Sequence, residues 1–114
     1  MMTKNKTVAT KKYDHKHWLS FGITEEDWTA LAYLVNATDK KGIKFHSLHK
    51  ASGNGLEALF EGYGNIPIIL NVSATGDSRV EYHRHWDKPA EYVRSCGDIK
   101  QNWESIARLI CNLR

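Results

Sequence analysis

Residues 66–86, with the sequence IPIILNVSATGDSRVEYHRHW, determine the predicted fold. Apolar side chains recur at every second position in residues 66–73, and again in most of residues 79–86, which is the period of a β-strand with one buried face. Between them, residues 74–78 (ATGDS) have the composition of a turn. The segment therefore predicts two antiparallel strands. The side chains expected on the buried face are Ile66, Ile68, Leu70, Val72, Val80, Tyr82 and Trp86.

Two more short runs precede this segment, at residues 43–49 and 56–62. Turn sequences separate them from each other and from the following strand: SGNG at residues 52–55 and YGN at residues 63–65. Four strands with three short connections predict an antiparallel meander. Residues 56–62 also fit two turns of helix.

A helix is predicted before the strands, at residues 25–38. Thr24 can cap its first turn, where Glu25, Glu26 and Asp27 meet the positive end of the helix dipole. The apolar side chains that follow recur at helical spacing, and residues 39–42 (DKKG) stop the helix.

Two helices are predicted after the strands. Asp87-Lys88-Pro89 can begin a short helix that ends at Gly97, and Asp98 can cap a last helix with Gln101 completing a capping box. The last helix has an apolar stripe made of Ile99, Trp103, Ile106, Ile110 and Leu113.

These elements predict an α+β fold of two layers, in which the helices cover one face of a four-stranded sheet. We expect residues 13–114 to form this single domain and residues 1–12 to be a basic, flexible tail. The first and fourth strands would be the sheet edges. The side chains expected to meet between the layers are Trp28, Leu31, Ile106 and Ile110 from the helices and Ile68, Leu70 and Val80 from the sheet.

Composition and charge exclude several classes of protein. The chain has 114 residues, no apolar run long enough to span a membrane and no apolar segment behind its first lysines, so we expect a cytoplasmic protein without membrane contact. Cys96 and Cys111 are too few for a disulfide framework, and we expect both to be free thiols.

The formal net charge is +3, but residues 1–20 alone hold five lysines and one aspartate. The rest is nearly neutral, which argues against a globular domain built to bind nucleic acid.

The six histidines occur in pairs, one of which is His83 and His85. The two-residue period places these two on the same face of the fourth strand, away from the helices and at least partly exposed. Glu81 shares that face. Two imidazoles can hold a metal ion, but zinc needs further ligands, and His46 would lie about 14 Å away in a simple meander. A metal-binding protein is therefore an alternative function, and we assign no metal ligand.

A small metal-independent ribonuclease is a second alternative. RNA cleavage without a metal needs an acid, a base and cations to hold the phosphate, and His83, His85, Arg79 and Lys44 supply these groups. No phosphate-binding loop or nucleophile motif occurs in the sequence, so we expect no cofactor.

The function that we favour is a binding or accessory protein without catalysis. It would recognise a protein or nucleoprotein partner through the exposed sheet face, with the basic tail as an arm for nucleic acid or an acidic surface. Trp18 lies among basic residues near the tail and can serve as an anchor. An edge strand can also pair with a second copy. The predicted binding residues are Lys44, His46, Leu48, Arg79, Glu81, His83, His85 and Trp18.

Overall fold

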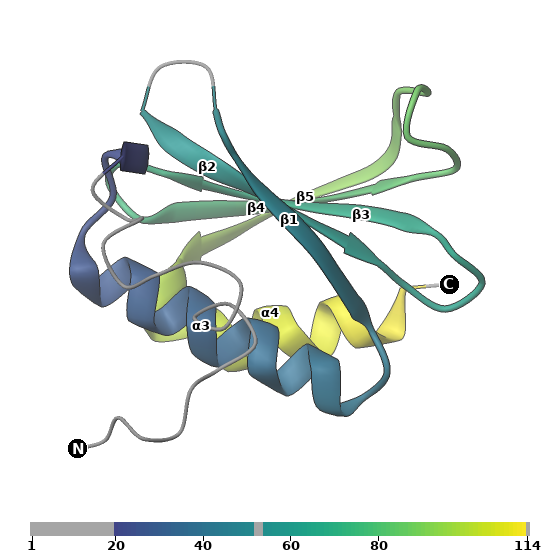
Figure 1. The fold of residues 1–114 in the computed structure, drawn as a ribbon, viewed down its shortest axis with the longest axis horizontal. Helices are drawn as coiled ribbons and strands as arrows, with labels where there is room; N and C mark the ends of the chain where they lie inside the picture. Colours follow the sequence, from purple (N-terminus) through teal and green to yellow (C-terminus); the bar gives the residue numbers. More distant parts are fainter. Residues whose placement is uncertain (1–19, 52–53, 114) are drawn as a thin grey trace.

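The computed structural model describes residues 20–51 and 54–113, and within them one helix, five strands and a second helix follow in order (Figure 1). Each strand pairs antiparallel with the next, so the sheet order is β1-β2-β3-β4-β5. The α+β class and the antiparallel meander are therefore confirmed. The bounds are α3 Glu25–Lys40, β1 Lys44–Lys50, β2 Gly55–Glu61, β3 Pro67–Ser73, β4 Asp77–His83, β5 Ala90–Asp98 and α4 Ile99–Asn112.

The prediction of a short helix at residues 87–97 is wrong, because most of this segment forms β5. Its register with β4 runs from His83↔Ala90 to Asp77↔Asp98, with a bulge near each end. The backbone groups of β4 find hydrogen-bond partners in β5, and this pairing outweighs the local helix-start pattern. Pro89 lies just before the strand, where its missing N–H costs no ladder bond. The sheet therefore has five strands, and β4 is an interior strand instead of an edge.

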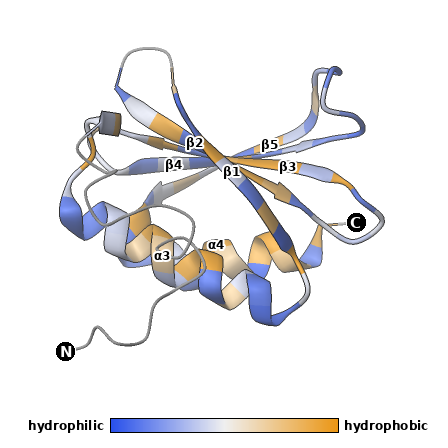
Figure 2. Ribbon diagram, viewed as in Figure 1, coloured by the Kyte–Doolittle hydropathy of each residue, from blue (hydrophilic) through white to orange (hydrophobic). Residues whose placement is uncertain are grey.

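Both helices lie on the same face of the sheet, which gives the predicted two layers (Figure 1). Hydrophobic residues are concentrated in the middle of α3, and its two ends are hydrophilic (Figure 2). No helix in the described part of the chain is both long and apolar enough to cross a membrane.

Two of the predicted helix caps, Thr24 and Asp98, are confirmed. The hydroxyl of Thr24 accepts a hydrogen bond from the backbone N–H of Asp27 at 3.1 Å and caps α3. A carboxylate oxygen of Asp98 accepts from the backbone N–H of Lys100 at 3.0 Å and caps α4. Both caps satisfy backbone donors that the helix itself leaves without partners.

The core lies between the two layers. All seven side chains expected to meet there are buried, and Phe60 is the largest fully buried side chain. Trp103 is only half-buried and packs at the border of the core. The other large side chains with no exposed surface include Leu31, Leu34, Ile43, Leu56, Ile68, Leu70, Ile99 and Ile110.

An ion pair joins the first turns of the two helices. The carboxylate of Asp27 is almost fully buried, and the Lys100 ammonium donates a hydrogen bond to it at 3.2 Å. This hydrogen bond is the main cause that raises the pKa of Lys100. The two residues are 73 positions apart in the sequence, so only the completed fold brings them together.

The two cysteines are free, half-buried and packed against the core. Burial raises the pKa of both thiols, although Arg94 acts in the opposite direction on Cys96 and Lys41 does so on Cys111. A raised pKa means a smaller thiolate fraction at neutral pH, and the thiolate is the reactive form.

We therefore expect both thiols of the folded protein to react slowly with a disulfide reagent at pH 7.5, and faster as the pH rises through 9. Absorbance of the released thiolate measures the rate, and the chain unfolded in denaturant is the control. Equal rates for the folded and unfolded chains would contradict the effect of burial.

Candidate functional site: the outer face of the sheet

The face of the sheet opposite the helices, called the outer face below, has a row of side chains that crosses all five strands. The strand register places Ser47, Leu59, Ile69, Glu81 and Val93 next to one another in that order. The row is mainly apolar, with one carboxylate, and Val93 is 52% exposed. This mixture of apolar and polar groups is typical of protein interfaces.

Strand β1 reaches the outer face differently from the prediction. The register shifts between Phe45 and Ser47, so His46 occupies a β-bulge. Such an extra residue changes which side chains face each side of the sheet. Leu48 therefore points toward the helices and is buried in the core, and its predicted place in the binding surface is wrong. His46 remains half-exposed, with its Nε2 atom 3.7 Å from a carboxylate oxygen of Glu61.

Glu81 is the centre of a polar network on the outer face. Its carboxylate accepts hydrogen bonds from Asn71 Nδ2 at 2.8 Å and from the Arg79 guanidinium at 3.0 Å. Its other oxygen lies 3.0 Å from His83 Nε2. The side chain of Glu81 is only 18% exposed, so these partners compensate the carboxylate for most of the water that it loses.

His83 is buried, which corrects the prediction of an exposed histidine. It lies on the outer side of β4, where the following loop contributes the backbone carbonyl of Lys88 as an acceptor for its Nδ1–H at 2.8 Å. Because Nδ1 donates its proton to this carbonyl, the hydrogen bond between Nε2 and Glu81 needs a second proton. Either the imidazole or the carboxylate carries it. Both ring nitrogens are therefore engaged by the protein itself.

The next two predicted residues lie beyond the end of β4. His85 is exposed in the loop, so it does not share a strand face with His83. Trp86 was predicted on the buried side, but it is 45% exposed. Its ring meets the ring of His46 edge-on, with 5.9 Å between the centroids. The loop rises from the sheet on the side away from the helices (Figure 1), which explains why Trp86 can pack against the outer face.

The structure thus brings together only some of the predicted site residues. Arg79, Glu81 and His83 form one network, and His46 belongs to a second contact with Trp86. Lys44 lies on edge strand β1, three strands away from β4. Trp18 lies outside the described residues. Asn71 and the carbonyl of Lys88 were not predicted, because only the fold shows that they meet Glu81 and His83.

No group of three or more histidine, cysteine, aspartate or glutamate side chains in residues 20–51 and 54–113 is arranged to hold a metal ion. Comparisons with family models, with curated proteins and with solved structures found no match.

Proposed function

We propose that this protein is a binding or accessory protein without catalysis, which recognises a protein or nucleoprotein partner through the outer face. The observation that carries the proposal is the combination of a self-contained polar network with an exposed aromatic ring. Glu81 and His83 satisfy each other's hydrogen bonds, which favours a rigid surface over a reactive one. Trp86 and Val93 leave large apolar areas open to a partner.

Charge gives the proposal a second component. The 94 residues that follow residue 20 carry 11 basic and 12 acidic side chains, so a basic domain face is not the basis of recognition. The five lysines of residues 1–20 would add long-range attraction to an acidic protein surface or to exposed phosphates in a nucleoprotein.

The alternatives make different demands on the same residues. A ribonuclease would need an imidazole that can exchange a proton with RNA. His83 could do so only after its hydrogen bond to Glu81 or to the Lys88 carbonyl breaks. The exposed His85 is the other predicted imidazole. No contact in the described residues favours a ribonuclease or a metal site over binding.

The experiment compares capture of a partner from a lysate of the source cells by immobilised full-length variants. We expect Trp86→Ala to reduce the captured amount about tenfold, which corresponds to ~1.4 kcal/mol of binding free energy. Tyr92→Ala is the matched control, because this ring is similarly exposed (38%, against 45% for Trp86) but alternates with Val93 along β5 and so lies on the other face of the sheet. Both substitutions are expected to change stability by no more than about 0.5 kcal/mol, which thermal melting would check.

Nuclease treatment of the lysate separates the two classes of partner. Capture that survives nuclease indicates a protein, and capture that requires intact nucleic acid indicates a nucleoprotein. If Trp86→Ala captures as much as the wild type, or if Tyr92→Ala loses as much as Trp86→Ala, recognition does not use the outer face.

A further inference from the structure

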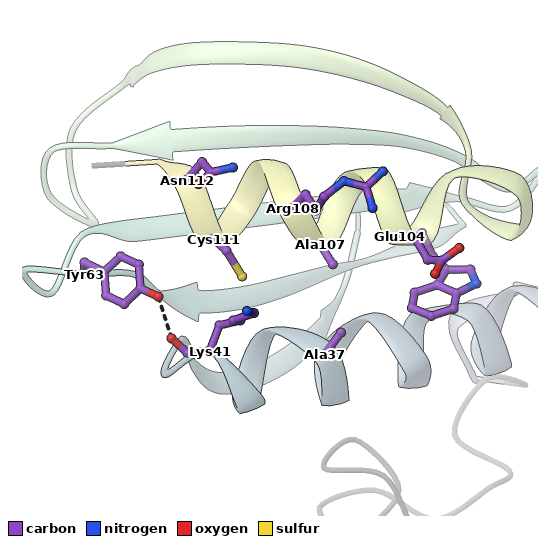
Figure 3. A pocket seen from close by; sticks show the side chains of 9 residues that line it. Ala37, Lys41, Tyr63, Glu104, Ala107, Arg108, Cys111 and Asn112 are labelled. Carbon is purple, nitrogen blue, oxygen red and sulfur yellow. Dashed lines mark hydrogen bonds between the residues drawn. The ribbon is translucent and has the colours of Figure 1, made fainter.

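A groove runs between α3 and α4, on the other layer of the molecule from the outer face. Small side chains border it, with Ala37 on α3 facing Ala107 and Cys111 on α4 (Figure 3). They leave a hollow of about 440 Å³. The hydroxyl of Tyr63 donates a hydrogen bond of 2.5 Å to the Lys41 carbonyl. This contact closes the groove at the C-terminal end of α3.

A second hollow of about 440 Å³ continues the groove on the other side of Trp103. Tyr33 from α3 and Trp103 from α4 meet between the two hollows, with 5.6 Å between their ring centroids. Tyr33 is 51% exposed although it lies in the middle of the helix. The groove therefore has an aromatic centre with an open hollow on each side of it.

The charges along the exposed side of α3 are arranged symmetrically about this centre. Glu26, Tyr33 and Lys40 are spaced seven residues apart, so they lie on one side of the helix. Glu25 and Lys41 extend the two ends. At 1.5 Å per residue, the acidic and basic ends are each about 10–12 Å from Tyr33.

We propose that this helix face packs against the same face of a second copy, with the helices antiparallel across a two-fold axis at Tyr33. Such an axis places Glu26 of each copy opposite Lys40 of the other and stacks the two aromatic centres. The acidic first turn and the basic last turn of α3 are complementary to those of a second α3 only when the two helices run antiparallel. The outer faces would point in opposite directions and remain free for the partner proposed above.

The surface has the size of a small interface. Helices of 16 and 14 residues are about 24 and 21 Å long, and two such helices side by side are about 20 Å wide. The pair of faces would bury roughly 1,000 Å² in total, which is at the low end for specific protein interfaces. We therefore expect a reversible dimer with a micromolar dissociation constant.

Charge reversal of the full-length protein tests the arrangement. Sedimentation equilibrium between about 1 and 500 µM should show the wild type passing from monomer to dimer. Glu25→Lys with Glu26→Lys makes both ends basic, and Lys40→Glu with Lys41→Glu makes both ends acidic, so each variant alone should be a monomer over this range. An equimolar mixture of the two should dimerise again, because each end then meets its opposite charge. Circular dichroism of each variant checks that α3 is intact.

A second pair of variants tests the same arrangement in case the charge-reversed variants do not fold. Tyr33→Arg places two like charges at the two-fold axis and should abolish the dimer. Val93→Arg is the matched control, since its side chain is as exposed (52%) but lies on edge strand β5, and it should leave the dimer unchanged. A wild type that is monomeric at all concentrations, a dimer that survives Tyr33→Arg, or a dimer lost with Val93→Arg would overturn the proposal. The last result would indicate pairing through β5 instead.

Discussion

Phe60→Ala is expected to lower the free energy of unfolding by about 3–5 kcal/mol, the range for removing a large aromatic side chain from a packed core. Phe60 lies on the helix side of β2 with no exposed surface, and its ring is 5.6 Å from the ring of Phe45. The substitution removes buried apolar area and leaves a cavity between the sheet and the helices. The midpoint and slope of urea unfolding measure the loss.

Leu59→Ala is the control for this prediction. Leu59 is the neighbour of Phe60 in the same strand, but it lies on the outer face and is only half-buried. Its replacement removes less buried area and should cost clearly less stability. Equal losses for the two variants would mean that the core does not lie between the helices and the sheet.

Gly55→Ala is expected to cost about 3–5 kcal/mol of stability, because the substitution combines backbone strain with a direct clash. Gly55 begins β2 with a φ of +116°, which side chains of L-residues rarely adopt. A Cβ atom there would be 2.5 Å from the carbonyl oxygen of Val72 and 3.0 Å from Cα of Ser73. Both atoms belong to the backbone of β3, so they cannot move away from the added Cβ as a flexible side chain could. Thermal melting and urea unfolding measure the loss.

Gly64→Ala separates the two effects. Gly64 also has a positive φ, +75°, but a Cβ atom there would meet nothing within 4 Å. This variant has the backbone strain without the clash, and we expect it to lose about 1–2 kcal/mol. If Gly55→Ala were no more harmful than Gly64→Ala, the close contact between β2 and β3 would not limit this position.

The elements that could be predicted are those with a local signal. Thr24 and Asp98 cap their helices through atoms two or three residues away, and the turns of the meander lie in short segments of the sequence. Strand β5 has no comparable signal. Its residues are exposed along most of its length, so no alternation marks a buried face, and its structure depends on pairing with β4.

The candidate site was less predictable for the same reason. The two-residue period correctly placed Glu81 and His83 on one side of β4, but burial of His83 depends on the carbonyl of Lys88 in the loop that follows. The bulge at His46, which turns Leu48 into the core, has no sequence signature that distinguishes it from a regular strand. The predictions for His83 and Leu48 are both wrong because the backbone there departs from a regular strand. The two-residue alternation of side chains applies only to a regular strand.

The pairing of α3 with α4 determines when the protein can complete its fold during synthesis. The strands join neighbour to neighbour, so each hairpin can form as soon as its second strand has left the ribosome. Helix α3 must wait for α4, which ends 72 residues after α3 does. At about 5–20 residues per second, this interval lasts roughly 4–14 s. Throughout that time Tyr33 lacks the ring of Trp103, and Asp27 lacks Lys100. The nascent chain therefore cannot close its helix layer, or bury Ile106 and Ile110, until residues 99–112 have emerged.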